Sequence, residues 1–370
     1  MVYLDNAATT FPKPDCVIDA MSEFMRNCGG NPSRGGHTLS QLSVEKVFLC
    51  REELASLIGV DSPEQIVFTK NTTEALNLAI KGVLSRGDEV IISSMEHNSV
   101  LRSCVDLEKE GVILKIVRAD SGGIVNPKDV SALITNKTRL ICITHISNVT
   151  GSVNPVREIC SVARKNGVLM LLDAAQSGGV LDIDTSCADM IAFAGHKGLY
   201  GPMGTGALYV CKGVELDTLL EGGTGSFSES ALMPDSFPDR FEAGTLNACG
   251  IAGLYEGIKF VKREGVSEKE KELGDFLISQ MSAVKGAKII GTPAVGVVGL
   301  SLYSHDCVDV STRLDREYNV ATRAGLHCSP MAHRTLGTIN SGLLRFSTGF
   351  FNTKDDISSA AHALQNILKN

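Results

Sequence analysis

One lysine in this chain stands where a lysine is costly to place. Lys197 follows the apolar run 190–194 and lies within the glycine-rich segment GHKGLYGPMGTG, residues 195–206. Lysine side chains are usually exposed, because burying a charged amine without a partner is unfavourable. Lys197 is therefore either an ordinary loop residue or an amine that does chemistry at the end of a strand.

Two other polar segments follow apolar runs in the same way. Asp173 ends the run VLMLLD, and Asn71, Thr72 and Thr73 precede a helical pattern. Taken alone, each is typical of a helix cap. However, ligands bind at the carboxyl ends of strands in open α/β sheets, and a helix N-terminus suits a phosphate.

Together these groups predict a pyridoxal 5′-phosphate site. The Lys197 amine would bond to the aldehyde of that cofactor, and Asp173 would keep its pyridine nitrogen protonated. The helix N-terminus at Thr72 would hold the phosphate.

The elements that must position these groups are strands alternating with helices. Apolar runs indicate strands at 64–69, 89–94, 113–119, 139–147, 168–176, 190–195 and 206–211. Such continuous runs are typical of strands buried on both faces of a mostly parallel sheet. Helical patterns at 73–84 and 156–167 separate some of them, which predicts a doubly wound α/β fold.

The pattern changes after about residue 250. Helical segments at 250–265 and 267–281 precede strand-like runs, and a last helix is expected near 355–368. We therefore expect a large domain of residues 15–255 that binds the cofactor. A smaller α+β domain would comprise residues 1–14 and 256–370.

Composition narrows the class of protein. The chain has 370 residues, 43% of them hydrophobic and 21% charged, with a formal net charge of −7. No run approaches the roughly 18 uncharged apolar residues that span a bilayer, and the N-terminus does not resemble a signal peptide. We expect a cytoplasmic protein whose partners include neither nucleic acid nor membrane.

Eleven cysteines are scattered singly along the chain. No CxxC pair is present, which argues against a zinc ribbon or a thioredoxin-type site, and no metal site is predicted. Most of the thiols are expected to be reduced and buried. One cysteine becomes a candidate for chemistry only through its context.

The motifs of the chain resemble those of the class V aminotransferase-like family. In order they read YLDNAATT, NPSRGGHTLS, NTTEALN, EHNS, HISNVTG, DAAQS, GHKGLYGPMGTG, FEAGT, TRAGLHC and LLRFSTGFFNT. The resemblance runs from residue 3 to about 360, and it looks most like the cysteine desulfurase and selenocysteine lyase branch. It implies the pyridoxal phosphate-dependent transferase fold of type I.

The resemblance also implies which side chains bind the cofactor. They are Thr72, Thr73, His97, Asn148, Asp173, Gln176, His196, Lys197 and Thr245. Lys197 would also move the substrate's Cα proton, and His97 would stack on the ring and act as an acid or base. Gln176 and Asn148 would hydrogen-bond the phenolic oxygen. Thr245 would reach the phosphate in a neighbouring subunit, which implies a homodimer.

The substrate residues follow from the same resemblance. Arg345 would clamp the substrate carboxylate, with Arg323 and Asn148 lining the pocket. Cys328 would be the nucleophile, joining Lys197 and His97 as catalytic residues. L-cysteine would become L-alanine, and the sulfur would remain as a persulfide on Cys328 for transfer to an acceptor protein.

Local context at Cys328 adds two expectations. His327 and nearby arginines could enrich the thiolate form of Cys328. The segment after it, residues 329–338, contains proline and glycine and is expected to be mobile or tightly turned.

Other activities stay open at this stage. Selenocysteine lyase is the main alternative, followed by another C–S lyase or aminotransferase and by a non-catalytic sulfur-relay partner. The chain also departs from the family pattern, and the motif HNS at 97–99 replaces a more usual pair of histidines. Ala194 stands where the family has Ser or Thr beside the phosphate, and Leu326 stands where one branch has histidine.

Overall fold

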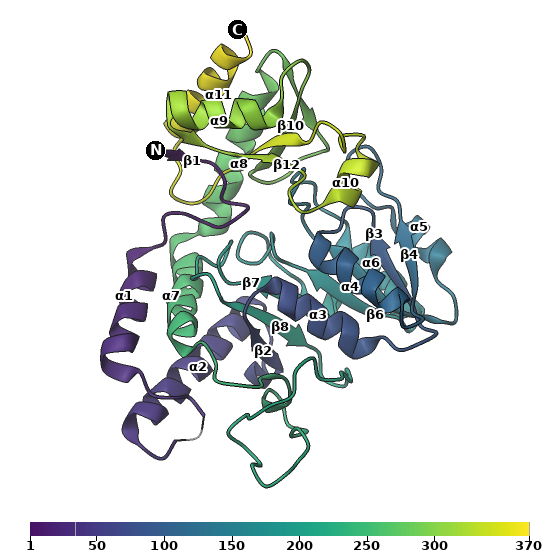
Figure 1. The fold of residues 1–370 in the computed structure, drawn as a ribbon, viewed down its shortest axis with the longest axis vertical. Coiled ribbons are helices and arrows are strands. Elements are labelled where there is room, and N and C mark those ends of the chain that lie inside the picture. Colours follow the sequence, from purple (N-terminus) through teal and green to yellow (C-terminus); the bar gives the residue numbers. More distant parts are fainter. Residues whose placement is uncertain (34, 370) are drawn as a thin grey trace.

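The computed structural model of the chain describes residues 1–33 and 35–369, and a seven-stranded sheet lies at its centre (Figure 1). Its order is β2-β8-β7-β6-β5-β3-β4. The bounds are β2 Ile66–Thr69, β3 Glu89–Ser93, β4 Ile113–Val117, β5 Thr138–Thr144, β6 Leu169–Asp173, β7 Met190–Ala194 and β8 Gly206–Val210. Only β8 runs opposite to the other strands of this sheet, which confirms the predicted mostly parallel sheet.

Helices cover both faces of this sheet. One face carries α3 (Thr72–Val83) and α4 (Asn98–Glu108), and Ile92 belongs to the core beneath them. The other face carries α2 (Thr38–Leu57), α5 (Pro127–Leu133), α6 (Val156–Lys165) and α7 (Ala248–Glu264), where Ile91 is buried. Alternate residues of one strand thus enter different cores, which explains the continuous apolar runs.

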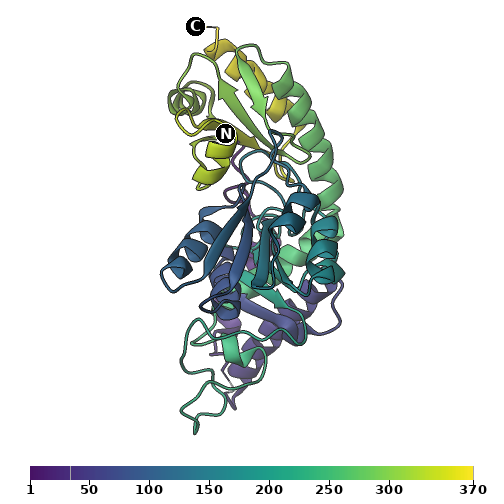
Figure 2. The same cartoon turned by 90° about the vertical axis from the view of Figure 1, so that its right-hand side faces the viewer.

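A second sheet lies above the first (Figure 2). Its antiparallel order is β12-β13-β10-β9, with bounds β9 Ala287–Ile290, β10 Val297–Leu302, β12 Arg323–Gly325 and β13 Leu343–Ser347. Three helices share its core: α8 Val266–Ser282, α9 Cys307–Tyr318 and α11 Lys354–Ile367. The N-terminal strand β1 (Val2–Tyr3) pairs with β11 (Val320–Ala321), so the first residues lie beside the second sheet.

The two sheets are joined by consecutive helices. Gly265 caps the end of α7, and its left-handed φ of 62° lets α8 begin at the next residue. α1 (Asp15–Glu23) packs on α7. We keep the division into residues 15–255 and residues 1–14 plus 256–370 as a proposal. No helix among the described residues is both long and apolar enough to cross a membrane.

Short helical elements complete the chain. They are Phe24–Cys28, Pro63–Gln65, Thr185–Cys187, Asp239–Phe241 and α10 (Pro330–Thr335). The prediction for the segment after Cys328 was incomplete, because α10 occupies part of it. Pro330 stands at the first helical position, where its missing N–H is not needed.

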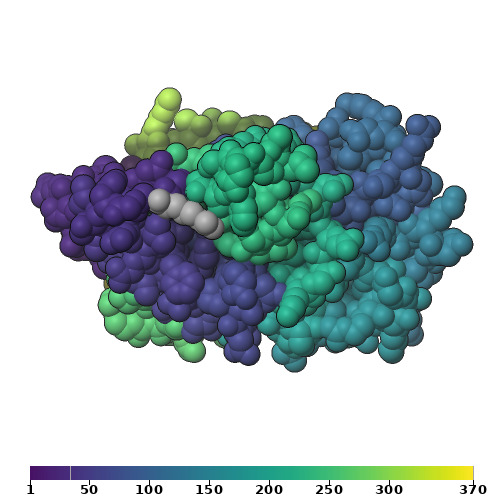
Figure 3. Space-filling model, turned by 90° about the horizontal axis from the view of Figure 1, so that it is seen from below, coloured from purple at the N-terminus to yellow at the C-terminus, as the bar shows by residue number. Residues whose placement is uncertain are grey.

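The long segment between β8 and α7 lies against the N-terminal helices (Figure 3). Its anchor is Glu242, which forms an ion pair with Arg51 of α2 and accepts a hydrogen bond from the Phe68 N–H at 2.6 Å. Arg51 also donates to the Ile66 carbonyl, and its guanidinium lies 4.5 Å from the centre of the Phe68 ring. Both charged residues are buried. The pair therefore ties α2, β2 and the segment that carries Thr245 into one unit.

We predict that Arg51→Met destabilises the protein by about 3–5 kcal/mol, because it leaves the Glu242 charge buried without its partner. Urea unfolding of the purified protein measures the change. The control is Lys109→Met, which breaks an exposed ion pair with Asp106 and should change the free energy of unfolding little. Equal effects of the two substitutions would contradict this account of the buried pair.

Candidate active site

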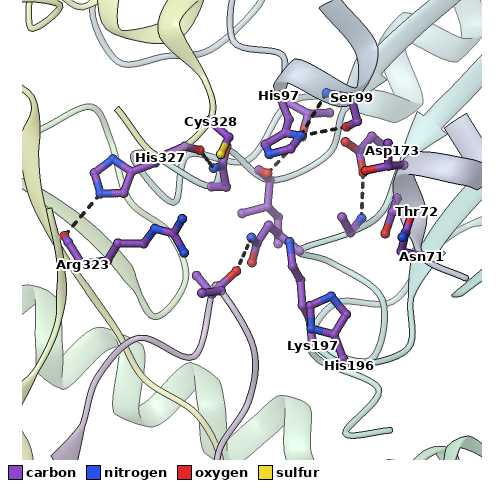
Figure 4. A pocket seen from close by; sticks show the side chains of 18 of the residues that line it. Asn71, Thr72, His97, Ser99, Asp173, His196, Lys197, Arg323, His327 and Cys328 are labelled. Atoms are coloured by element: carbon purple, nitrogen blue, oxygen red, sulfur yellow. Dashed lines mark hydrogen bonds between the residues drawn. The ribbon is translucent and has the colours of Figure 1, made fainter. Parts of the chain in front are cut away.

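A cavity of about 220 Å³ lies where the two sheets face each other (Figure 4). Its walls come from the ends of β5, β6 and β7, the starts of α3 and α4, the N-terminal segment and the second sheet. The lining residues are Ala7, Ala8, Asn71, Thr72, Thr73, His97, Ser99, Thr144, Ile146, Asn148, Asp173, Ala175, Gln176, His196, Lys197, Arg323, His327, Cys328 and Arg345. The cavity thus gathers every site residue predicted from the sequence except Thr245.

Lys197 reaches this cavity from a tightly packed turn after β7. A side chain at Gly195 would place its Cβ 2.1 Å from the Thr205 hydroxyl oxygen, and one at Gly198 would lie 2.4 Å from the Gly178 carbonyl oxygen. Both positions therefore require glycine. The Tyr200 N–H closes the turn by donating to the Lys197 carbonyl at 2.8 Å.

The N-terminal segment holds the other side of this turn. Thr9, Thr10 and Lys13 all donate hydrogen bonds to the His196 carbonyl, with the Lys13 Nζ at 2.9 Å. Thr10 also donates to the Lys197 carbonyl at 3.2 Å. Sequence reasoning missed these supporting residues, because no local pattern in this segment indicates that it meets residues 196 and 197.

Electrostatics make Lys197 a reactive amine. Burial lowers the pKa of Lys197 to about 8, and the charge of Asp173 partly opposes this shift. Asp173 is itself buried, which raises its pKa, while the Ala175 N–H donates to it at 2.9 Å. A larger share of the Lys197 side chains is therefore uncharged near neutral pH than for an exposed lysine.

The two predicted histidines are neutral at physiological pH. Burial lowers the pKa of His97 and of His196 to about 4 in each case. His97 caps α4 and accepts a hydrogen bond from the Ser99 N–H at 3.1 Å. The buried Nδ1 of His196 has no hydrogen-bond partner within the described part of the chain.

The start of α3 offers a site for an anion. Asn71 caps the helix by accepting from the Glu74 N–H at 3.0 Å, and Thr72 and Thr73 line the cavity. Helix N-termini attract anions through their dipole and free N–H groups. The methyl group of Ala194, at the end of β7, supplies no hydroxyl at this edge of the sheet.

Gln176 and Thr245 have contacts that the sequence did not indicate. The Gln176 side chain donates to the Ala7 carbonyl at 2.9 Å and lines the cavity. Thr245 is exposed and lies outside the cavity, where the Asn31 side chain approaches its hydroxyl at 3.5 Å.

The arginines enter from the second sheet. Arg345 on β13 and Arg323 on β12 are paired across the two strands. Arg345 is buried, donating to Asp5 at 2.6 Å and to the Asn148 carbonyl at 2.9 Å. Its Nε is buried with no partner among the described residues, so these two contacts leave some of its five N–H donors unused.

The thiol of Cys328 is exposed and faces the same cavity as Lys197 (Figure 4). His327 and Cys328 both have positive φ, 51° and 57°, a conformation that requires support from neighbouring groups. The Asn98 N–H donates to the Cys328 carbonyl at 2.8 Å, and Asn148 donates to the His327 carbonyl at 2.8 Å. The loop is therefore held by the start of α4 and by the segment after β5.

The expected role of His327 was wrong. Burial lowers the pKa of His327 to about 3, so its ring carries no charge that would favour a thiolate. Its ring nitrogens lie 3.4 Å from His333 Nε2 and 3.3 Å from the Arg323 carbonyl oxygen. His327 instead helps to shape the loop that presents the thiol.

Some lining residues had no predicted role in the site. They are Ala7, Ala8, Ser99, Thr144, Ile146 and Ala175. Ser99 lies within a motif beside the predicted His97, which was a usable signal. Asp5 touches Arg345 from the start of the chain, and no local pattern indicates that contact.

The chain is similar to curated proteins along nearly its whole length. Curated relatives include a probable cysteine desulfurase of Methanothermobacter thermautotrophicus, 37% identical over 99% of this chain and 94% of the relative. A cysteine desulfurase of Escherichia coli O127:H6 is 35% identical over 99% of this chain and 93% of its own length.

Solved structures agree with this similarity. An apo cysteine desulfurase from Thermococcus onnurineus NA1 superposes with a TM-score of 0.91 at 30% identity, covering 99% of this chain and 94% of that one. The Escherichia coli cysteine desulfurase CsdA gives 0.88 at 26% identity, covering 100% and 94%. The family model for aminotransferase class-V matches residues 2–359. The predicted resemblance is thus confirmed, and the chain belongs to the aminotransferase class-V family.

Proposed function

We propose that this protein is a pyridoxal phosphate-dependent cysteine desulfurase, which converts L-cysteine to L-alanine and keeps the sulfur on Cys328 as a persulfide. One observation carries the proposal: an exposed thiol, an enclosed amine and a buried guanidinium line a single cavity, at Cys328, Lys197 and Arg345. The relatives named cysteine desulfurase, which align along nearly the whole chain, support the same reaction.

The residues present fit the proposed cofactor. Lys197 supplies an amine with a lowered pKa, and Asp173 supplies a buried carboxylate for a ring nitrogen. The start of α3 with Thr72 and Thr73 suits the phosphate, and His196, whose Nδ1 has no partner among the described residues, lines the same cavity. When bound, pyridoxal phosphate draws electrons from the amino acid and makes its Cα proton acidic.

Three side chains would complete the cofactor site. His97 would lie against the ring, and Gln176 and Asn148 would hydrogen-bond the phenolic oxygen. All three line the cavity. Neutral His97 would pack on a ring without adding a charge.

The substrate would be held by its carboxylate. Arg345 and Arg323 line the cavity from adjacent strands, and the Arg345 Nε has no partner among the described residues. A guanidinium binds a carboxylate through paired hydrogen bonds. Asn148 would orient the substrate beside the thiol, because it already contacts both Arg345 and the Cys328 loop.

The proton and sulfur steps would then fall to two residues. The neutral Lys197 amine would take the proton from the substrate Cα. The Cys328 thiolate would attack the substrate sulfur, so that a new S–S bond forms as the Cβ–S bond breaks. The electron pair of the broken bond would stay with the carbon, and Cβ would take a proton to become the methyl group of alanine. Alanine would leave, and the terminal sulfur would remain on Cys328.

An acceptor protein would collect the sulfur from outside. Cys328 also lines an open groove of about 540 Å³ beside α3 and α4, so its thiol is within reach of a second molecule. We include a homodimer in the proposal, in which exposed Thr245 would reach the phosphate held by a neighbouring subunit.

Replacing Lys197 with Ala should remove the visible absorbance of the lysine-bound cofactor, because no other amine is expected to take its place. Absorbance spectra of purified protein loaded with pyridoxal phosphate measure this. The control is Lys13→Met, which removes a neighbouring amine whose pKa burial also lowers to about 8. If the band vanished in Lys13→Met and persisted in Lys197→Ala, the assignment would be wrong.

Replacing Cys328 with Ala should lower alanine release from L-cysteine by at least about a hundredfold, because the sulfur then lacks its nucleophile. The matched control is Cys28→Ala, a partly exposed cysteine outside the cavity-lining set. Alanine release from selenocysteine should be measured in parallel. A wild-type protein active on selenocysteine alone would replace the proposal with selenocysteine lyase.

Cofactor loading should depend on pH through Lys197. The amine reacts when deprotonated, so the loading rate of apoprotein should rise with pH around a midpoint near 8. Asp173→Asn should move this midpoint to lower pH, since the Asp173 charge raises the pKa of Lys197. Stopped-flow absorbance measures the rate, and a midpoint that stays in place or moves upward would contradict the coupling.

A further inference from the structure

A buried phenol connects the two halves of the site without lining the cavity. Tyr200 is 1% exposed, and its hydroxyl donates to Glu270 Oε1 at 2.5 Å. The same oxygen accepts a hydrogen bond from the Phe350 N–H at 2.5 Å. Donor and acceptor capacity of the hydroxyl are therefore both used, as burial requires.

The three partners come from separate parts of the fold. Tyr200 stands three residues after Lys197 and closes its turn with a hydrogen bond to the Lys197 carbonyl. Phe350 stands five residues after Arg345, at the end of the segment that continues β13. Glu270 lies on α8, which packs beneath the second sheet.

The connection is tight and specific. Tyr200 has a left-handed φ of 55°, which an ordinary residue adopts only with support. A side chain at Gly349 would place its Cβ 3.1 Å from the Tyr200 hydroxyl, so the strand extension approaches the phenol closely. Burial raises the pKa of Glu270 to about 7 and raises that of Tyr200. The hydrogen bond from Tyr200 opposes the shift at Glu270, because it stabilises the charged carboxylate.

We propose that Tyr200 is a positioning residue, whose hydroxyl sets the separation of Lys197 and Arg345. It joins the Lys197 turn to the segment that follows β13, and Glu270 accepts its proton in a hydrogen bond. The inference rests on the proposed function, in which one substrate must meet both residues. A substrate bound at Arg345 reacts beside Lys197 only if the two sheets hold these side chains at the right separation.

Packing around the ring does not require the hydroxyl. The Tyr200 ring lies 5.5 Å from the Phe260 ring and 6.2 Å from the Phe351 ring, between centroids. Tyr200→Phe keeps these contacts and removes one oxygen atom. The substitution therefore separates the connection from the aromatic cluster.

The first test is the steady-state kinetics of the holoenzyme with L-cysteine. We expect Tyr200→Phe to raise KM by roughly tenfold while kcat stays within about twofold. In this variant the free protein no longer holds Lys197 and Arg345 at the right separation, and substrate binding restores that separation. Unchanged KM with a lowered melting temperature would overturn the proposal. Wild-type protein that releases no alanine would instead count against the proposed function.

Two further variants separate position from stability. Val266→Ala removes methyl groups from a fully buried residue of the same core cluster and should lower the melting temperature without changing KM. Glu270→Gln keeps an acceptor for the phenol and should retain a near wild-type KM, whereas Glu270→Leu should resemble Tyr200→Phe. A Glu270→Leu variant with wild-type KM would contradict the role of the carboxyl.

Hydrogen–deuterium exchange tests the connection independently of turnover. In Tyr200→Phe, or in Glu270→Leu should the first variant not fold, amide exchange should increase together in residues 196–201 and 345–350. An increase confined to the Phe350 side would show that the two segments are not coupled through the phenol. That result would overturn the inference whatever reaction the protein catalyses.

Discussion

The burial of the Lys197 amine is the physical constraint on which the rest of the site depends. Burial disfavours its charge and lowers its pKa to about 8, and Asp173 is the strongest opposing influence. The fold supplies this acid from the adjacent strand, because β6 and β7 are paired with Asp173 opposite Ala192. Amine and acid thus emerge at one edge of one sheet, where parallel strands place their ligand-binding ends.

The remaining half of the site comes from the second sheet and the chain's own beginning. Arg345 is held by Asp5 and by the Asn148 carbonyl, so its position depends on two segments distant in the sequence. The Tyr200 hydroxyl joins the Lys197 turn to α8 and to the segment after β13. A buried arginine can keep a spare donor for a ligand only where its other donors are satisfied, because each unpaired buried donor costs free energy.

The nucleophile is presented by a held loop rather than a free one. Asn98 and Asn148 fix the carbonyls of Cys328 and His327, and Ser329 donates to the Asn148 side chain at 2.9 Å. These contacts support two left-handed residues in succession. A short supported loop keeps the thiol between the cavity and the open groove, so the thiol faces both.

Much of this protein follows from its sequence alone. Apolar runs located β6 and β7, because strands buried on both faces lack alternation, and polar residues at their ends marked Asp173 and Lys197. Only the tertiary structure decided the pairing of Asp5 with Arg345, the neutral state of His327 and helix α10 after the thiol. Local periodicity reports which residues are buried, whereas these features depend on which distant segments meet around them.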